Sequence, residues 1–173
     1  MLRVGIDPGV ANCGVAVLLG RRVIYAETHR LFTGSEIKHR LPMRIVVAAA
    51  AELVREVISK TCPPISRTNE GPSRSVSHLQ VEQQLPNRPR ELAIEYGTIA
   101  AGTALGIGTV RHVNARALKR KYGLGCEGHD QNKRNAVALV KGWVKGGELL
   151  WDGVDLEELS DHVSDAILVA LFE

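Results

Sequence analysis

Cysteine is scarce in this chain of 173 residues, which contains only Cys13, Cys62 and Cys126. Three scattered cysteines without a C-x-x-C pair argue against a disulfide framework and against a cysteine-rich zinc site. Cys126 and His129 have a ligand-like spacing, but structural zinc needs four ligands, so we interpret this pair as coincidence. We therefore expect a reducing, intracellular location, which would be the cytoplasm for a bacterial or viral protein.

Long apolar runs are also missing. A helix that crosses a bilayer needs about 20 mainly apolar residues, and the nearest candidate, Ile45 to Ile58, contains Glu52, Arg55 and Glu56. The N-terminus has no basic segment followed by an apolar stretch and a small-residue cleavage site. We expect a soluble protein with no secretion signal and no membrane partner.

Charge of one sign does not dominate, because 22 basic and 19 acidic residues give a formal net charge of +3. An argument for nucleic-acid binding must therefore depend on local clusters of bases. Such clusters occur at Lys38-His39-Arg40, at Arg116 with Lys119-Arg120-Lys121, and at Lys133-Arg134. Each can neutralise phosphates or simply form a solvated surface, and the sequence leaves both interpretations open.

The hydrophobic content of 45% fits one globular domain that spans residues 1–173. Short apolar runs between turn residues predict strands, and helical periodicity predicts helices. The strands are predicted at Leu2–Asp7, Cys13–Leu19, Arg22–Glu27, Ser77–Glu82 and Thr109–Val113, and the helices at Pro42–Ser59, Glu91–Leu105, Ala115–Tyr122, Asp130–Val144 and Leu156–Phe172. Asp130 is expected to cap its helix, and Thr61–Ser77, rich in proline and serine, predicts a mobile surface loop.

The order of these elements predicts an α/β fold. The first three strands form a plausible antiparallel meander, after which helices and strands alternate before three final helices. This arrangement favours a mixed five-stranded sheet with helices on both faces.

Two of the predicted strands end in an acid. Asp7 closes the apolar run that Pro8-Gly9 breaks, and Glu82 opens the polar series Glu82-Gln83-Gln84. Consecutive polar residues at the end of a central strand are costly unless they meet water, metal or substrate. Taken alone, Asp7 can also be a turn cap and Glu82 a surface acid.

The last helix supplies further candidates in Asp161-His162-Val163-Ser164-Asp165. Asp161 and His162 lie four and three residues before Asp165, so both flank it on one helix face. Considered alone, this segment can also be the solvent-exposed face of a helix. Together, however, the three acidic segments provide the oxygen ligands that hard divalent cations need, and a two-ion site takes three or four such ligands.

These segments resemble the motifs of Holliday-junction resolvases of the RuvC and poxvirus type, which belong to the ribonuclease-H-like superfamily. Gly5-Ile6-Asp7-Pro8-Gly9 with Asn12 and Gly14 is similar to the first motif, Val81-Glu82-Gln83-Gln84 to the second, and His162-Val163-Ser164-Asp165-Ala166 to the last. Asn114 to Lys119 and Asn132-Lys133-Arg134 are similar to the lysine-bearing region of the family. The resemblance spans nearly the whole chain, with the motifs in the same order.

This resemblance implies a structure-selective endonuclease that cuts four-way DNA junctions by paired symmetric nicks, with two Mg²⁺ or Mn²⁺ ions per active site. Asp7, Glu82 and Asp165 would be metal ligands, and the fourth ligand would lie three residues before Asp165. His162 occupies that position, where many relatives carry aspartate and some histidine, and Asp161 remains the alternative. Because imidazole is a softer ligand than carboxylate, Mn²⁺ is expected to support activity at least as well as Mg²⁺.

The lysines of the resemblance also imply roles at the substrate. Lys133, and with less support Lys119, would approach a phosphate or the proton path of the reaction. Lys119, Arg120, Lys121, Lys133 and Arg134 are the candidate DNA-binding residues. A solvated lysine remains the alternative for each.

A four-way junction has two equivalent strands to cut, so a symmetric homodimer is expected. The family uses a helix near Glu91–Leu105 for its dimer, and the small residues Ala93, Gly97, Ala100, Ala101 and Ala104 permit close approach there. Packing of this helix onto its own sheet would explain the same composition.

Three other functions are compatible with parts of the sequence. An actin-like or sugar-kinase ATPase also begins with a strand, an Asp and glycines, but its two lobes need far more than 173 residues. A non-catalytic nucleic-acid-binding relative is disfavoured because all four ligand positions are filled. A nuclease for other branched DNA or for RNA/DNA hybrids remains open, since motifs do not reveal how substrate shape is read.

Overall fold

The computed structural model describes residues 1–38, 41–62, 75–125, 128–152 and 156–173. Its elements follow in the order β1 (Leu2–Asp7), β2 (Cys13–Leu19), β3 (Arg22–His29), α1 (Gly34–Lys38), α2 (Met43–Thr61), β4 (Val76–Glu82), α3 (Pro89–Ala104), β5 (Thr109–Val113), α4 (Ala115–Lys121), α5 (His129–Lys145), β6 (Leu150–Trp151), the short 3-10 helix η1 (Leu156–Glu158) and α6 (Asp161–Leu171). Most of the predicted loop Thr61–Ser77, and Cys126 of the Cys126–His129 pair, lie outside the described residues.

The strands form one mixed sheet in the order β5-β4-β1-β2-β3-β6. β1, β2 and β3 make the predicted antiparallel meander, while β4 runs parallel to β1 and β5 runs parallel to β4. The α/β class is confirmed, but the predicted count of five strands is wrong. The sixth strand, β6, pairs only Leu150 and Trp151 with β3, and two residues are too few to produce an alternating pattern in the sequence.

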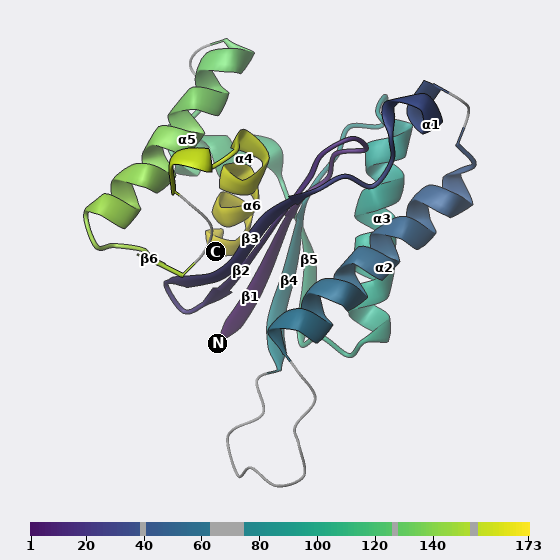
Figure 1. Cartoon of the computed structure of the whole chain (residues 1–173), viewed down its shortest axis with the longest axis horizontal. Coiled ribbons are helices and arrows are strands. Elements are labelled where there is room, and N and C mark those ends of the chain that lie inside the picture. Colours follow the sequence, from purple (N-terminus) through teal and green to yellow (C-terminus); the bar gives the residue numbers. More distant parts are fainter. Residues whose placement is uncertain (39–40, 63–74, 126–127, 153–155) are drawn as a thin grey trace, which may run out of the picture.

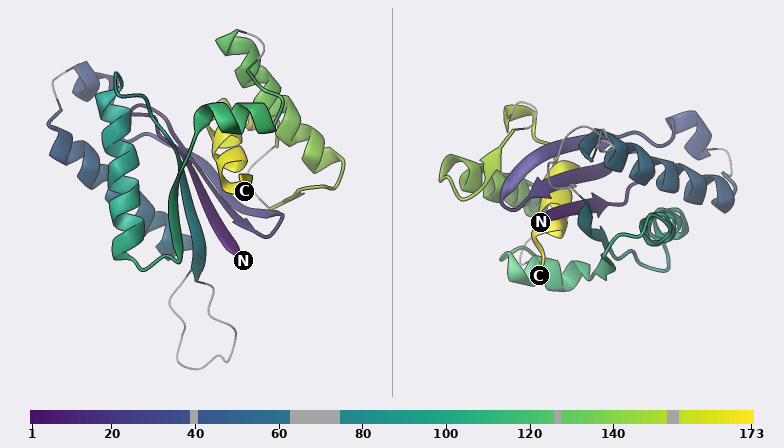
Figure 2. Two further views of the ribbon diagram at one scale, coloured as in Figure 1. Left: turned by 180° about the vertical axis from the view of Figure 1, so that it is seen from behind. Right: turned by 90° about the horizontal axis from the view of Figure 1, so that it is seen from below.

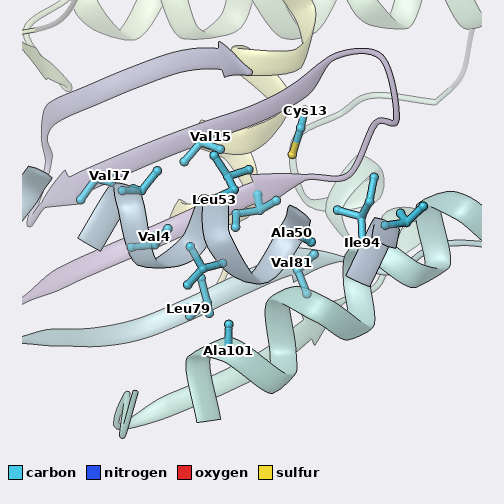
Figure 3. Close-up of a cluster of buried hydrophobic side chains, with 14 of the residues drawn as sticks. Val4, Cys13, Val15, Val17, Ala50, Leu53, Leu79, Val81, Ile94 and Ala101 are labelled. Carbon is cyan, nitrogen blue, oxygen red and sulfur yellow. The ribbon is translucent and has the colours of Figure 1, made fainter. Parts of the chain in front are cut away.

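Helices cover both faces of the sheet, as predicted (Figures 1 and 2). α2 and α3 pack on one face, where Val4, Val15, Leu53, Leu79 and Ile94 form part of a continuous apolar cluster (Figure 3). α4, α5 and α6 cover the other face over a second cluster. β2 contributes to both clusters, which explains why its sequence is apolar throughout rather than alternating.

Two predictions about helix ends are wrong. The last helix does not run from Leu156 to Phe172: α6 begins anew after Ser160, whose hydroxyl accepts a hydrogen bond from Val163 N at 3.1 Å. This N-cap separates α6 from η1. Asp130 does not cap α5, which begins one residue earlier after Gly128, so Asp130 lies in the first turn, where its charge still complements the helix dipole.

The small residues of α3 are used mainly inside the molecule. A Cβ atom at Gly97 would collide with the backbone of Val47 in α2, and one at Gly102 would collide with Leu79 in β4. Ala93 and Ala101 are buried, whereas Ala100 and Ala104 are exposed. Packing onto its own sheet and onto α2 therefore accounts for Ala93, Gly97 and Ala101.

Cys13 and Cys62 are free thiols. Burial, together with the nearby Asp7 carboxylate, raises the pKa of Cys13 to about 12, so this thiol remains neutral and packs as a small apolar side chain. Among the described helices, none is both long enough and apolar enough to span a bilayer.

Candidate metal centre

The site forms where β1 and β4 end side by side. The two strands are parallel neighbours, with Ile6 opposite Val81, so their carboxyl ends meet at one edge of the sheet. Asp7 and Glu82 are the last residues of these strands. Side chains two residues apart in a strand share a face, and Gly5 faces α6, so Asp7 points toward that helix.

Glycines on β1 and β2 allow α6 to lie close to the sheet. A Cβ atom at Gly5 would collide with the backbone of Ala166 and with Ala170, and one at Gly14 would collide with the carbonyl of His162. The side chain of Ser160 fixes the start of α6. The first turn of this helix therefore reaches the ends of the strands, and it carries His162 and Asp165 toward Asp7.

Four of the predicted ligands come together there. Asp7, Glu82, His162 and Asp165 line one cavity of about 350 Å³, together with Lys119 and Lys133. His162 Nδ1 lies 2.9 Å from Asp7 Oδ2, within hydrogen-bond distance. Asp7 itself is 9% exposed, so its carboxylate is held at the floor of the cavity.

The electrostatics of the cavity favour a cation. Burial and the neighbouring carboxylates of Asp7 and Asp165 raise the pKa of Glu82 well above its ordinary value. Burial, Asp7 and Asp161 raise the pKa of Asp165 to about 7. The hydrogen bond to Asp7 raises the pKa of His162, although burial opposes it. Burial and the mutual repulsion of the carboxylates thus favour the protonated forms of Glu82 and Asp165, whereas attraction to Asp7 favours the protonated imidazole of His162.

The donor set fits a divalent metal ion. Carboxylate oxygens are the ligands that Mg²⁺ and Mn²⁺ take in proteins, and the softer imidazole of His162 favours Mn²⁺ of the two. The positive charge of an ion would also offset the repulsion between the carboxylates. Within the described ranges, no three His, Cys, Asp or Glu side chains are grouped closely enough to form a ready-made metal cage. The donors therefore line the cavity without forming a closed cage.

Asp161 has a different partner from its neighbour. Its carboxylate accepts a hydrogen bond from the Lys133 ammonium and lines the adjoining cavity of about 460 Å³ with Lys133 and Arg134. Burial would raise the Asp161 pKa, but the ammonium of Lys133 and the charge on His162 more than offset this, so the pKa is lowered. The structure thus directs His162 toward Asp7, and Asp161 toward Lys133.

The predicted DNA-binding residues do not all share one surface. Lys119 and Lys133 line the carboxylate cavity, and Arg120 and Arg134 are exposed next to them in the chain. Lys121 lies apart: its ammonium is 5.1 Å from the centre of the Phe172 ring and 3.5 Å from the Glu173 carbonyl oxygen. In the predicted cluster Lys38-His39-Arg40, residues 39–40 and the side chain of Lys38 lie outside the part of the chain that the structure describes.

Arg88 and Glu91 were missed from the sequence. Both line the carboxylate cavity. They also line a neighbouring cavity of about 680 Å³, to which Gly9 and His162 contribute as well. Arg88 precedes Pro89 at the start of α3, and Glu91 follows in its first turn. Nothing in their spacing separates them from ordinary residues at a helix start, so the sequence held no signal for them.

Comparison with known proteins identifies the same fold elsewhere. The chain superposes on Thermus thermophilus RuvC in complex with a Holliday junction substrate with a TM-score of 0.64 and 18% identity, covering 99% of this chain and 91% of the other. A second Thermus thermophilus RuvC structure gives a TM-score of 0.62 and 19% identity over 99% and 92% of the two chains. No protein-family model and no curated protein sequence matches this chain. The predicted resemblance to RuvC is confirmed at the level of the fold.

Proposed function

We propose that this protein is a metal-dependent endonuclease that resolves four-way DNA junctions by paired symmetric nicks. One observation carries the proposal: Asp7, Glu82, His162 and Asp165, from three separate segments, converge on one cavity. The fold shared with a RuvC that binds a Holliday junction substrate supports the choice of substrate.

In this proposal Asp7, Glu82, His162 and Asp165 hold two Mg²⁺ or Mn²⁺ ions. When bound, the ions activate the attacking water and stabilise the leaving oxygen during phosphodiester hydrolysis. Asp7 lies next to both Glu82 and His162, so its carboxylate would be shared by the donors that hold the metal. His162 would give up its proton to serve as a ligand, because only the neutral imidazole binds metal.

Lys119 and Lys133 would hold the substrate phosphate. Both line the cavity, Lys119 from α4 and Lys133 from α5. The ion pair with Asp161 orients the Lys133 side chain, of which 35% is exposed. Arg120 and Arg134 would contact flanking phosphates, whereas the same role for Lys121 requires it to leave Phe172 and Glu173.

The substrate is tested by cleavage of a synthetic mobile four-way junction beside a linear duplex and an RNA/DNA hybrid of the same sequence. The proposal predicts symmetric nicks in two opposing junction strands and no comparable cleavage of the duplex or hybrid. Cleavage confined to the hybrid would reject junction resolution while leaving the metal centre intact.

His162→Ala is expected to lower the single-turnover rate of junction cleavage about 100-fold, because a metal ligand is lost. Asp161→Ala is expected to cost about tenfold, because Lys133 loses the partner that orients it. The two rates are compared at saturating metal. Wild-type activity in His162→Ala with loss in Asp161→Ala would show that the neighbour is the ligand.

Mn²⁺ is expected to support junction cleavage at least as fast as Mg²⁺ at equal concentration. The reason is the imidazole of His162, which Mn²⁺ accepts as a ligand more readily than Mg²⁺ does. Initial rates with each ion, in wild type and in His162→Asp, measure the effect. The preference for Mn²⁺ should shrink in His162→Asp, and an unchanged ratio would remove the imidazole as its cause.

A homodimer built on the outer face of α3 would bring two such sites to one junction. Tyr96 on this helix is 57% exposed and Leu105, which follows its last residue, is 45% exposed, with Ala100 and Ala104 exposed between them in the sequence. Small residues flanked by large apolar ones permit close helix approach between two copies.

Ala100→Arg is therefore expected to weaken dimerisation at least 100-fold and to abolish paired nicking. Sedimentation equilibrium measures the association, and Leu150→Arg, which changes an exposed leucine on β6, is the matched control. A wild-type protein that stays monomeric at micromolar concentration, or an Ala100→Arg variant that stays dimeric, would contradict this interface.

A further inference from the structure

α3 carries a buried acid that is not part of the cavity lining described above. Glu95 is 2% exposed and lies on the inner face of this helix. A carboxylate without water is costly to bury unless hydrogen bonds satisfy its oxygens. Glu95 meets this requirement with two hydrogen-bond partners, one from the turn after β4 and one from β5.

The first donor is the backbone of the turn that follows β4. Gln84 N donates to Glu95 Oε2 at 2.8 Å, two residues beyond the proposed ligand Glu82. The second partner is the ring of His112 on β5, whose Nδ1 is hydrogen-bonded to Glu95 Oε1. This bond ties the inner face of α3 to β5.

These two contacts join a short network of hydrogen bonds. Gln83 N donates to Val113 O at 2.8 Å, which extends the pairing of β4 with β5 beyond Glu82. The Asn114 side chain donates to Gln83 Oε1 at 3.2 Å, and its oxygen accepts from Arg116 N and Ala117 N at the start of α4. α4 carries Lys119 into the cavity.

We infer that Glu95 is a positioning residue for the metal centre: it locks the ends of β4 and β5 together and so fixes Glu82 and Lys119 relative to Asp7. This inference rests on the proposed nuclease function and adds a residue to its machinery. Glu95 touches neither substrate nor metal in this role and acts through Gln84 and His112. Partners of this kind behind metal ligands typically change metal affinity or activity 10–100-fold when removed.

A purely structural role predicts a different result. If Glu95 only filled space in the core, its loss would act like the loss of Ile94, the adjacent and fully buried residue of the same helix. Ile94 packs in the apolar cluster with α2 and the sheet. Ile94→Ala is therefore the matched control for any general loosening of α3.

The experiment compares wild type, Glu95→Ala, Glu95→Gln and Ile94→Ala at a temperature where all four are folded. Three quantities are measured: the hydrogen exchange of the Gln84 amide, the Mn²⁺ dissociation constant, and the single-turnover rate of junction cleavage at saturating Mn²⁺. Junction affinity, measured in Ca²⁺, serves as a reference that positioning should leave unchanged.

Glu95→Ala is expected to expose the Gln84 amide, to weaken Mn²⁺ binding about tenfold and to slow cleavage 10–100-fold, with junction affinity within about threefold. Glu95→Gln should recover most of the activity, because its amide oxygen can accept from Gln84 N while its NH₂ donates to the other tautomer of His112. Ile94→Ala should lose less than about threefold in both Mn²⁺ binding and rate.

The inference is overturned if Glu95→Ala retains the wild-type Mn²⁺ affinity, or if its losses match those of Ile94→Ala. Failure of the proposed function has a separate signature, in which the wild-type protein binds Mn²⁺ but cuts no junction. In that case the amide-exchange and Mn²⁺-binding results still decide whether Glu95 positions the site.

Discussion

Asp7→Asn is expected to lower the rate of junction cleavage at least about 1,000-fold while the protein remains folded. The carboxylate is hydrogen-bonded to the imidazole of His162 and lies next to Glu82, so it connects two of the proposed ligands. A thousandfold loss corresponds to about 4 kcal/mol of transition-state stabilisation, which is the scale of a lost metal-ion contribution.

The isosteric amide makes this test specific. Asparagine keeps a side-chain oxygen within reach of His162 Nδ1, so the packing of α6 against β1 should survive. Single-turnover cleavage and junction affinity are measured side by side. A loss of cleavage with retained junction binding supports a ligand role for Asp7, whereas activity within tenfold of wild type would remove Asp7 from the reaction.

Asp165→Asn is expected to make the metal-free protein more stable at pH 8. Burial and neighbouring acids raise the pKa of Asp165 to about 7 in the folded state, against about 3.9 for an unperturbed Asp in the unfolded chain. Between these values the folded state binds more protons than the unfolded state. Stability therefore falls as the pH rises from about 4 to about 7, and Glu82 acts in the same direction.

The size of this effect is a few kcal/mol at most, because relaxation and water reduce the full electrostatic penalty. A gain of about 1–3 kcal/mol would raise the melting temperature of a domain of this size by roughly 2–12 °C. Calorimetry in EDTA from pH 5 to pH 8 measures it, with and without added Mn²⁺.

Added Mn²⁺ should reverse the order of stability. The ion binds the folded wild type and stabilises it by mass action, whereas the variant lacks one ligand and gains less. Two results would contradict this explanation: a rise in the stability of metal-free wild type from pH 5 to pH 8, or an Asp165→Asn variant that is less stable than wild type at pH 8 in EDTA. Either result would mean that burial and repulsion between Asp165 and its neighbouring carboxylates do not destabilise the metal-free fold.

The sequence predicted the centre of the fold well because local and global signals agree there. Apolar runs interrupted by turns define β1, β2 and β4. Asp7 lies where the run of β1 ends, and Glu82 lies where the run of β4 ends. Gly5 and Gly14 belong to the predicted first motif, but only the structure shows why glycine is needed there. A side chain at either position would prevent α6 from packing against β1 and β2.

Other features depend on tertiary contacts that no spacing encodes. Lys119 and Lys121 belong to one basic run, yet one enters the cavity and the other packs over Phe172. Glu95 looks like a solvated acid in an alanine-rich helix, and only its partners reveal a buried role. Ser160 differs from these, because a serine before an apolar helix is a recognisable N-cap, yet the predicted helix Leu156–Phe172 ran through it.

Calorimetric titration of Mn²⁺ tests most directly whether Asp7, Glu82, His162 and Asp165 form a divalent-cation site. We expect saturable binding by the wild type at pH 8 and at least tenfold weaker binding in Asp7→Asn and Asp165→Asn. Wild-type binding should also be weaker at pH 6, because the raised pKa values of Asp165 and His162 favour their protonated forms there. Equal Mn²⁺ affinity in wild type and Asp7→Asn would contradict a divalent-cation site at these residues.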